Sequence, residues 1–160
     1  MKNIIIFAAT VLTLSFAAHA QNYKTYENKA FSIDYPEKWE VTWDSDKFLN
    51  LADPDGNIRF DITFNEEGTT KAQLQYCVDN WIYMKESHGH KVDQKLVKDD
   101  YALVRSIETD EDKGTQTVVV WFLMISSEPQ CFSGTINSDF DHANEALDIL
   151  VNMLATLSPK

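Results

Sequence analysis

Apolar and polar residues alternate along most of the first third of the chain that follows residue 20. The segment 31–35 (FSIDY) alternates strictly, and the segment 39–43 does so again after a proline, which is typical of half-buried β-strands. Two more such segments, 48–52 and 57–64, flank the turn sequence DPDG and predict a β-hairpin. Every second residue of 57–64 is apolar, so one side of this strand is predicted to face the core.

The period of the pattern changes in the middle of the chain. Apolar residues recur at helical spacing over 70–86, and Thr70 followed by Gln73 matches a capping box, so a helix is predicted there. The strands predicted after it are 91–97, 101–108, 117–125 and 131–137. The run VVVWFLMI is apolar at every position, which is typical of a strand covered on both sides. A second amphipathic helix is predicted to begin after Asp139 or Asp141.

This order of elements predicts the fold class. Hairpin-length turns dominate, and neither an internal repeat nor a linker interrupts residues 21–160, so we expect one α+β domain there. Its sheet should be mostly antiparallel. Because the strand at 117–125 is apolar on both sides, we expect the helices to cover both faces of the sheet.

Residues 1–20 have the pattern of a cleaved signal peptide. Lys2 supplies the positive start, 4–18 form an apolar core, and the sequence AHA that ends at Ala20 suits signal peptidase, with cleavage after Ala20. The apolar core is short for a membrane span, and a retained anchor is the alternative. No cysteine stands near the cleavage point, so there is no lipobox. We therefore expect a periplasmic or secreted protein without a membrane anchor.

The chain is acidic, with 25 Asp and Glu against 14 Lys and Arg and a formal net charge of -11. Such a balance argues against nucleic acid as a partner, because no basic patch could displace counterions from phosphates. It also disfavours binding to an anionic membrane surface. Acidity keeps a protein soluble and monomeric or weakly oligomeric, and it suits a basic protein partner.

The two cysteines, Cys77 and Cys131, bear on the compartment. In an exported chain an even number of cysteines favours a disulfide, and the loop that this one closes would stabilise the fold by about 4 kcal/mol. The predicted order places Cys77 on the first helix and Cys131 on a strand beneath it. Two separately buried thiols are the alternative.

Residues with catalytic or metal-binding chemistry are few. His88 and His90 form the one close pair of imidazoles, and nearby carboxylates or His142 could complete a metal site, but a polar loop between a helix and a strand is the favoured explanation of the pair. Paired carboxylates fall in predicted turns, where nothing would separate their pKa values as acid–base catalysis requires. No nucleophile elbow, zinc helix or phosphate loop occurs. We expect no enzymatic activity and no cofactor.

One short segment is a candidate for contact with a partner. Trp43, Asp44 and Asp46 combine an aromatic ring with two carboxylates on a predicted strand and the turn after it. Aromatic residues of this kind are enriched at the centres of protein interfaces. We therefore predict an exposed acidic and aromatic edge at these three residues.

The first strand and the proline after it resemble a known family. The matching residues are Tyr26, Asn28, Phe31, Ser32, Ile33, Asp34, Tyr35, Pro36 and Trp39. They are similar to the N-terminal pattern of the PsbP/Mog1-like superfamily. This resemblance implies an α/β/α sandwich and, since members bind other macromolecules rather than catalyse reactions, a binding role. It transfers no functional residue.

The expected function is therefore an exported, non-enzymatic binding or accessory module that acts on a protein partner in the periplasm or outside the cell. An immunity protein or a chaperone-like protein is a special case of this role. The alternative is a metal-binding protein or a hydrolase that uses His88, His90 and nearby carboxylates.

Overall fold

The computed structural model of the protein describes residues 22–110 and 114–160. The elements in chain order are β1 (Tyr23–Glu27), β2 (Phe31–Pro36), β3 (Glu40–Asp44), β4 (Phe48–Ala52), β5 (Ile58–Asn65), α2 (Lys71–Ser87), β6 (Lys91–Val97), β7 (Tyr101–Asp110), β8 (Thr115–Ser127), β9 (Gln130–Asp139), α3 (Ala143–Thr156) and β10 (Ser158–Pro159). The predicted signal peptide and its cleavage point after Ala20 lie outside the described residues.

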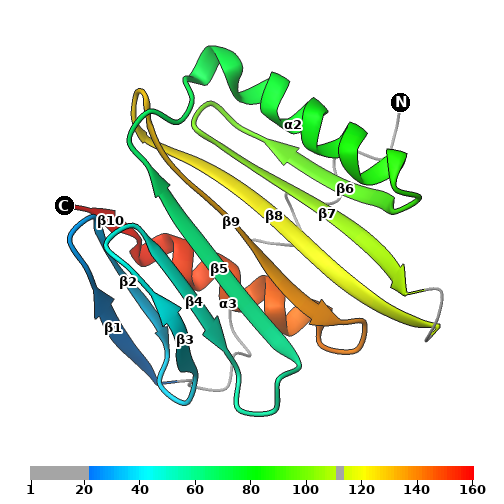
Figure 1. Ribbon diagram of the computed structural model, residues 1–160, viewed down its shortest axis with the longest axis horizontal. Coiled ribbons are helices and arrows are strands. Elements are labelled where there is room, and N and C mark those ends of the chain that lie inside the picture. The colour runs from blue at the N-terminus through cyan, green and yellow to red at the C-terminus, as the bar shows by residue number, and fades with distance from the viewer. Residues whose placement is uncertain (1–21, 111–113) are drawn as a thin grey trace.

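The strands form two sheets instead of the one that the sequence suggested (Figure 1). The larger has seven strands in the order β3-β4-β5-β9-β8-β7-β6, and the smaller has three in the order β1-β2-β10. Every pairing is antiparallel, so the expectation of an α+β protein with antiparallel sheets and two helices is confirmed.

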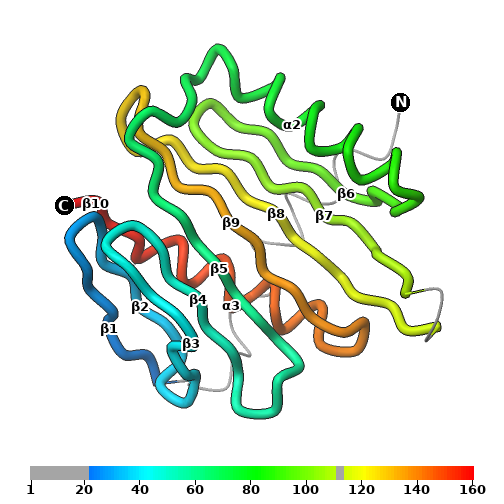
Figure 2. The backbone as a smooth tube through the Cα atoms, in the orientation of Figure 1, coloured from blue at the N-terminus to red at the C-terminus, as the bar shows by residue number. Residues whose placement is uncertain are grey.

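The proline at position 36 marks the point where the chain changes sheet. Pro36 is the last residue of β2, and the Trp39 amide donates to the Pro36 carbonyl oxygen at 2.9 Å, which closes a tight turn. A proline has no N–H for a sheet ladder, so the strand ends there. Figure 2 shows the backbone leaving β2 and returning as β3, which belongs to the larger sheet.

The main core lies between β2, the larger sheet and α3. Its largest fully buried members include Phe31 of β2, Phe60 of β5, Phe122 of β8 and Leu150 of α3. The Phe60 and Phe122 rings stack with their centroids 5.9 Å apart. The segment that carries the family resemblance therefore supplies core residues, including Phe31 and Trp39.

A second cluster forms where α2 meets the larger sheet. Leu74 and Val78 of α2 pack with Leu123 and Ile125 of β8, whereas Phe122, which directly precedes Leu123, belongs to the main core with α3. Alternate residues of β8 thus enter different clusters. The apolar run predicted for this strand is explained by these two clusters, since both sides of β8 are buried.

The start of α2 follows the local signal in the sequence, whereas the start of α3 differs from the predicted one. The Thr70 amide donates to the Gln73 side-chain oxygen at 3.3 Å, so the capping-box residues lie at the start of α2 as predicted. Before α3, Asp139 Oδ1 accepts from the His142 amide at 2.9 Å, but the N-cap residue is His142, which makes no side-chain capping bond, so neither Asp139 nor Asp141 caps this helix as the sequence had suggested. The chain after α3 forms the short strand β10 against β2, an element that the sequence did not predict. No helix within the described residues is long and apolar enough to cross a membrane.

Candidate functional site: the exposed edge at Trp43 and the adjoining sheet face

The predicted partner edge lies on β3, an outermost strand of the larger sheet. All five residues of β3 are exposed, and the Trp43 side chain is 65% exposed. The Trp43 ring packs against Phe48 with 4.8 Å between the centroids, so it stands on an aromatic support at the surface. The alternation over 39–43 had suggested a buried side for this strand, and that prediction is wrong because Trp39 alone, which precedes β3, enters the core.

The two carboxylates of the predicted edge contact residues of the hairpin formed by β1 and β2. Asp44 accepts a hydrogen bond from the Tyr26 hydroxyl at 3.0 Å, and Asp46 pairs with the Lys29 ammonium at 2.7 Å. Burial, followed by the hydrogen bond to Asp44, raises the pKa of Tyr26, and the bond to Asp46 raises that of Lys29. Exposed pairs of this kind contribute little to stability. The edge itself is polar and open to solvent, since all five residues of β3 are exposed.

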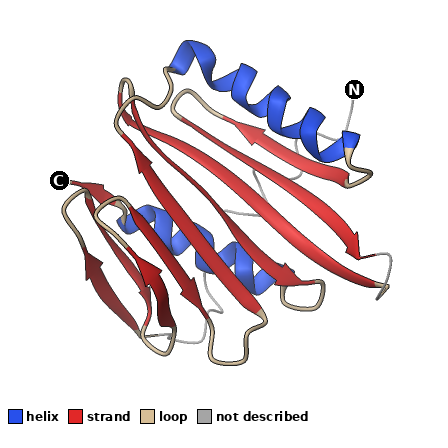
Figure 3. Ribbon diagram, viewed as in Figure 1, coloured by secondary structure: helices blue, strands red, loops and turns tan. Residues whose placement is uncertain are grey.

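Trp43 begins a row of side chains that crosses the larger sheet. Strand register pairs Trp43 with Asn50, Asn50 with Asp61, Asp61 with Thr135 and Thr135 with Trp121. Paired residues point to the same side of a sheet. We call these five residues, Trp43, Asn50, Asp61, Thr135 and Trp121, the sheet-face row. They lie opposite the core residues of β5, and Figure 3 shows no described helix in front of β4 and β5.

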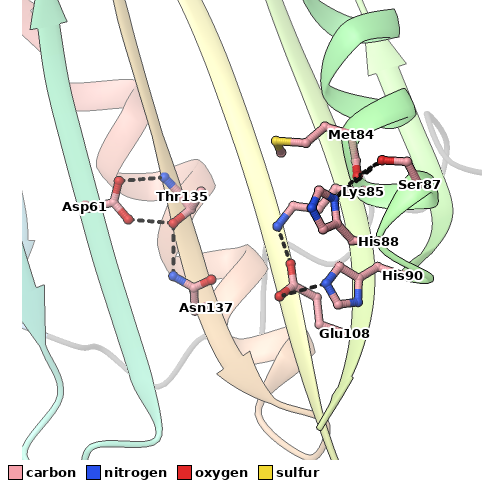
Figure 4. A network of polar contacts seen from close by, with 9 residues as sticks. All are labelled: Asp61, Met84, Lys85, Ser87, His88, His90, Glu108, Thr135 and Asn137. Carbon is pink, nitrogen blue, oxygen red and sulfur yellow. Dashed lines mark hydrogen bonds and ion pairs between the residues drawn. The ribbon is translucent and has the colours of Figure 1, made fainter. Parts of the chain in front are cut away.

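At the centre of the row, Asp61 is half-buried and bonded to neutral partners. Its carboxylate accepts from the Thr135 hydroxyl at 2.5 Å and from the Thr135 amide at 3.2 Å, and Asn137 donates to the Thr135 hydroxyl at 2.9 Å (Figure 4). Burial raises the pKa of Asp61, while the two bonds from Thr135 act in the opposite direction. Asp61 is therefore a partly desolvated carboxylate whose hydrogen-bond donors are neutral.

At the far end of the row lies an aromatic pair between the sheet and α2. The Trp121 ring stacks on Trp81 with 5.6 Å between the centroids, and the Lys85 ammonium lies 5.1 Å from the centre of the Trp81 ring. Lys85 also pairs with Glu108 of β7, and His90 Nε2 is 3.9 Å from the same carboxylate (Figure 4). The negative charge of Glu108 is therefore matched by basic groups.

The two histidines of the predicted metal site have different neighbours. His88 Nδ1 lies 2.7 Å from the Met84 carbonyl oxygen, whereas His90 faces Glu108. His142 lies at the start of α3, bonded to Asp139. Within the part of the chain that the structure describes, no group of three or more His, Cys, Asp or Glu side chains is placed to hold a metal ion.

The two cysteines carry free thiols and lie in the same cluster beneath α2. The predicted disulfide is thus not formed in the structure, although Thr69 contacts both residues. Its hydroxyl oxygen is 3.5 Å from Cys77 Sγ, and its amide donates to Cys131. Burial raises the pKa of the Cys131 thiol, which favours the neutral form.

The raised pKa of Asp61 predicts that its contribution to folding stability depends on pH, and the variant Asp61→Asn should remove this dependence. A carboxyl whose pKa is higher in the folded than in the unfolded state contributes stability below its unfolded pKa, and this is lost as the pH rises through the folded pKa. The amide has no such loss and still offers an oxygen to the Thr135 amide. Urea unfolding at pH 3.5 and pH 7 should therefore show that the free energy of unfolding of the variant, relative to that of the wild type, is higher at pH 7 than at pH 3.5. If the two proteins differ in free energy of unfolding by the same amount at both pH values, the conclusion that burial raises the pKa of Asp61 is wrong.

The comparisons with known proteins identify the fold through structure alone. No family model and no curated protein sequence matches the chain. The Ran-binding protein Mog1p of Saccharomyces cerevisiae superimposes with a TM-score of 0.60 at 12% identity, over 87% of this chain and 96% of that one. The PsbP protein CyanoP of Synechocystis gives 0.54 at 9% identity, over 90% and 96%.

A Bacteroides thetaiotaomicron protein gives a TM-score of 0.51 at 15% identity, and the match covers 84% of this chain and 49% of that one. The chain therefore has a PsbP/Mog1-like fold, and the resemblance predicted from its first strand is confirmed at the level of structure. Identities this low say nothing about which residues act.

Proposed function

We propose that this protein is a non-enzymatic accessory module that binds a protein partner through the exposed edge around Trp43. The observation that carries the proposal is an indole that is 65% exposed, on an edge strand whose five residues are all exposed, and supported by Phe48 at 4.8 Å. When a partner buries a large aromatic ring that is already held in place at the surface, binding is favoured, because apolar area is buried at little cost in side-chain entropy.

The fold and the charge support this role. Mog1p, which has the same fold, is a Ran-binding protein, so a chain of this fold and size can serve as a binding module. The carboxylates at Trp43 and the net charge of -11 favour a partner that is basic at its contact surface. An immunity or chaperone-like role falls within this proposal.

We further propose the finer points of location and layout. The pattern of residues 1–20 supports export to the periplasm or the medium. The separate clusters on alternate residues of β8, one with α3 and one with α2, support the α/β/α sandwich with helices on both faces of the larger sheet.

Affinity capture with paired variants tests the binding role. Wild-type protein, Trp43→Ala and Tyr83→Ala would be used as baits in envelope and medium fractions of the source organism. Tyr83 is 75% exposed on α2, so its variant removes a comparable exposed aromatic ring elsewhere. One stoichiometric partner should be retained by the wild type and by Tyr83→Ala and lost by Trp43→Ala. Equal loss from both variants, or retention by both, would exclude the edge at Trp43.

Export also predicts the state of the two cysteines. The thiols of Cys77 and Cys131 are free in the structure but belong to one cluster, and we propose that oxidation joins them if the chain reaches an oxidising compartment. Intact protein purified from the exported fraction without reductant should have a mass lower by two hydrogens and should resist alkylation. Reduction should then lower the free energy of unfolding by about 4 kcal/mol. Full alkylation before reduction would show that the thiols remain separate.

A further inference from the structure

Two carboxylates lie on the sheet side that Trp43 and Trp121 share, and their surroundings differ. Glu108, near α2, pairs with Lys85 and lies beside His90. Asp61, at the centre of the sheet-face row, accepts only from neutral donors and forms no ion pair within residues 22–110 and 114–160. Figure 4 shows both carboxylates, the first facing basic side chains and the second facing Thr135.

No basic residue of the described chain compensates Asp61. Arg59 precedes it by two residues on the same strand, but its side chain is exposed and forms no ion pair with Asp61 in the described ranges. A half-buried carboxylate loses hydration without gaining a counter-ion, which is unfavourable unless something else offsets the cost. The Thr135 bonds offset part of it and leave the negative charge uncompensated.

The surroundings of Asp61 limit what could supply the missing charge. Asn50 and Thr135 flank it across the neighbouring strands, and the exposed ring of Trp43 follows one strand further. Adjacent strands are about 4.8 Å apart, so Trp43 and Asp61 lie about 10 Å from each other across the sheet. This distance suits an extended chain that places an aromatic or aliphatic contact on Trp43 and a long cationic side chain on Asp61.

From this geometry we infer that the sheet-face row is the docking surface for a basic segment of the partner, with an arginine or lysine side chain paired to Asp61. The inference rests on the proposed binding function and extends it from the edge at Trp43 to the centre of the sheet. Arginine suits the surface best, because its guanidinium pairs with a carboxylate through two hydrogen bonds and also stacks on aromatic rings.

The test uses a defined probe in place of the unidentified partner. An acetylated, amidated peptide GRGRGRG and its glutamate counterpart GEGEGEG would be titrated into the 15N-labelled mature protein. The arginine peptide should shift the amide signals of β4, β5 and β9, and the glutamate peptide should leave them unchanged. Shifts confined to other surfaces would overturn the inference.

Three variants identify the residue responsible. Asp61→Asn should weaken binding of the arginine peptide at least tenfold, whereas Asp55→Asn, which removes an exposed carboxylate in the β4–β5 turn, should change it less than twofold. If the two variants weaken binding equally, the peptide responds only to the net charge of the protein, and the inference is overturned. A loss with Trp43→Ala but not with Asp61→Asn would leave the proposed function standing and refute the role of Asp61. Unchanged binding in both would count against both proposals.

Discussion

Replacing Trp39 by alanine is expected to lower the free energy of unfolding by about 3–5 kcal/mol. The Trp39 side chain is 3% exposed and belongs to the main core, at the point where the chain passes from the smaller to the larger sheet. Truncation would leave a cavity beside the turn at Pro36 and loosen the attachment of β2 to β3. Equilibrium unfolding in urea, followed by circular dichroism, measures the difference.

Trp43→Ala is the matched control, since it removes the same side chain four residues along. This indole is 65% exposed and contacts chiefly Phe48, so its loss should cost about 1 kcal/mol or less. The two variants are expected to separate stability from binding, because Trp39→Ala unfolds more easily and Trp43→Ala loses the partner. Similar unfolding free energies for both would contradict the assignment of Trp39 to the core.

The second large effect is expected at Gly134, in the middle of β9. A Cβ atom at this position would lie 2.9 Å from the Phe122 ring and would overlap the backbone carbonyl oxygen of Asp61 on the neighbouring strand. Backbone atoms within a ladder cannot move aside without breaking the pairing of β5 with β9. Gly134→Ala should therefore destabilise the protein by about 3 kcal/mol, near the upper end of the cost of overpacking.

Ser133→Ala tests whether this cost is specific to Gly134. Ser133 is the preceding residue, half-buried on the other side of the strand, and its hydroxyl accepts one hydrogen bond from Asn65 at 3.2 Å. Its loss should cost about 1 kcal/mol. Thermal unfolding of the two variants, measured together, compares them directly. A Gly134→Ala protein as stable as Ser133→Ala would contradict the close approach of β5 and β9.

Local signals in the sequence predicted the helices and most of the strands. The capping residues Thr70 and Gln73 placed the start of α2, and the strand predicted at 91–97 has the observed bounds of β6. The division into two sheets was not predicted, because the pattern before and after Pro36 shows two strands without showing their neighbours. Strand β10 was also missed, since its two residues pair with β2 from the other end of the chain.

The candidate site was predictable only in part. An exposed aromatic edge was expected at Trp43, and its indole is exposed as anticipated. Asp61 was placed on the polar side of its strand, but nothing near it in sequence distinguishes it from Arg59 or Thr63. What distinguishes it is the pairing with Thr135, which is far away in sequence and meets it only after β5 and β9 join. Polar contacts formed by such long-range strand pairings leave no local signal in the sequence.

Site-specific photocrosslinking from position 43 tests the central claim, that a protein partner covers this edge, most directly. A photoreactive phenylalanine analogue would replace Trp43 in one sample and Tyr83 in another, and the source organism would be irradiated before extraction. We expect one discrete adduct from position 43, identified by mass spectrometry as a protein with a basic contact segment, and none of that mass from position 83. Failure of position 43 to form any adduct, or the same adducts from both positions, would contradict binding at this edge.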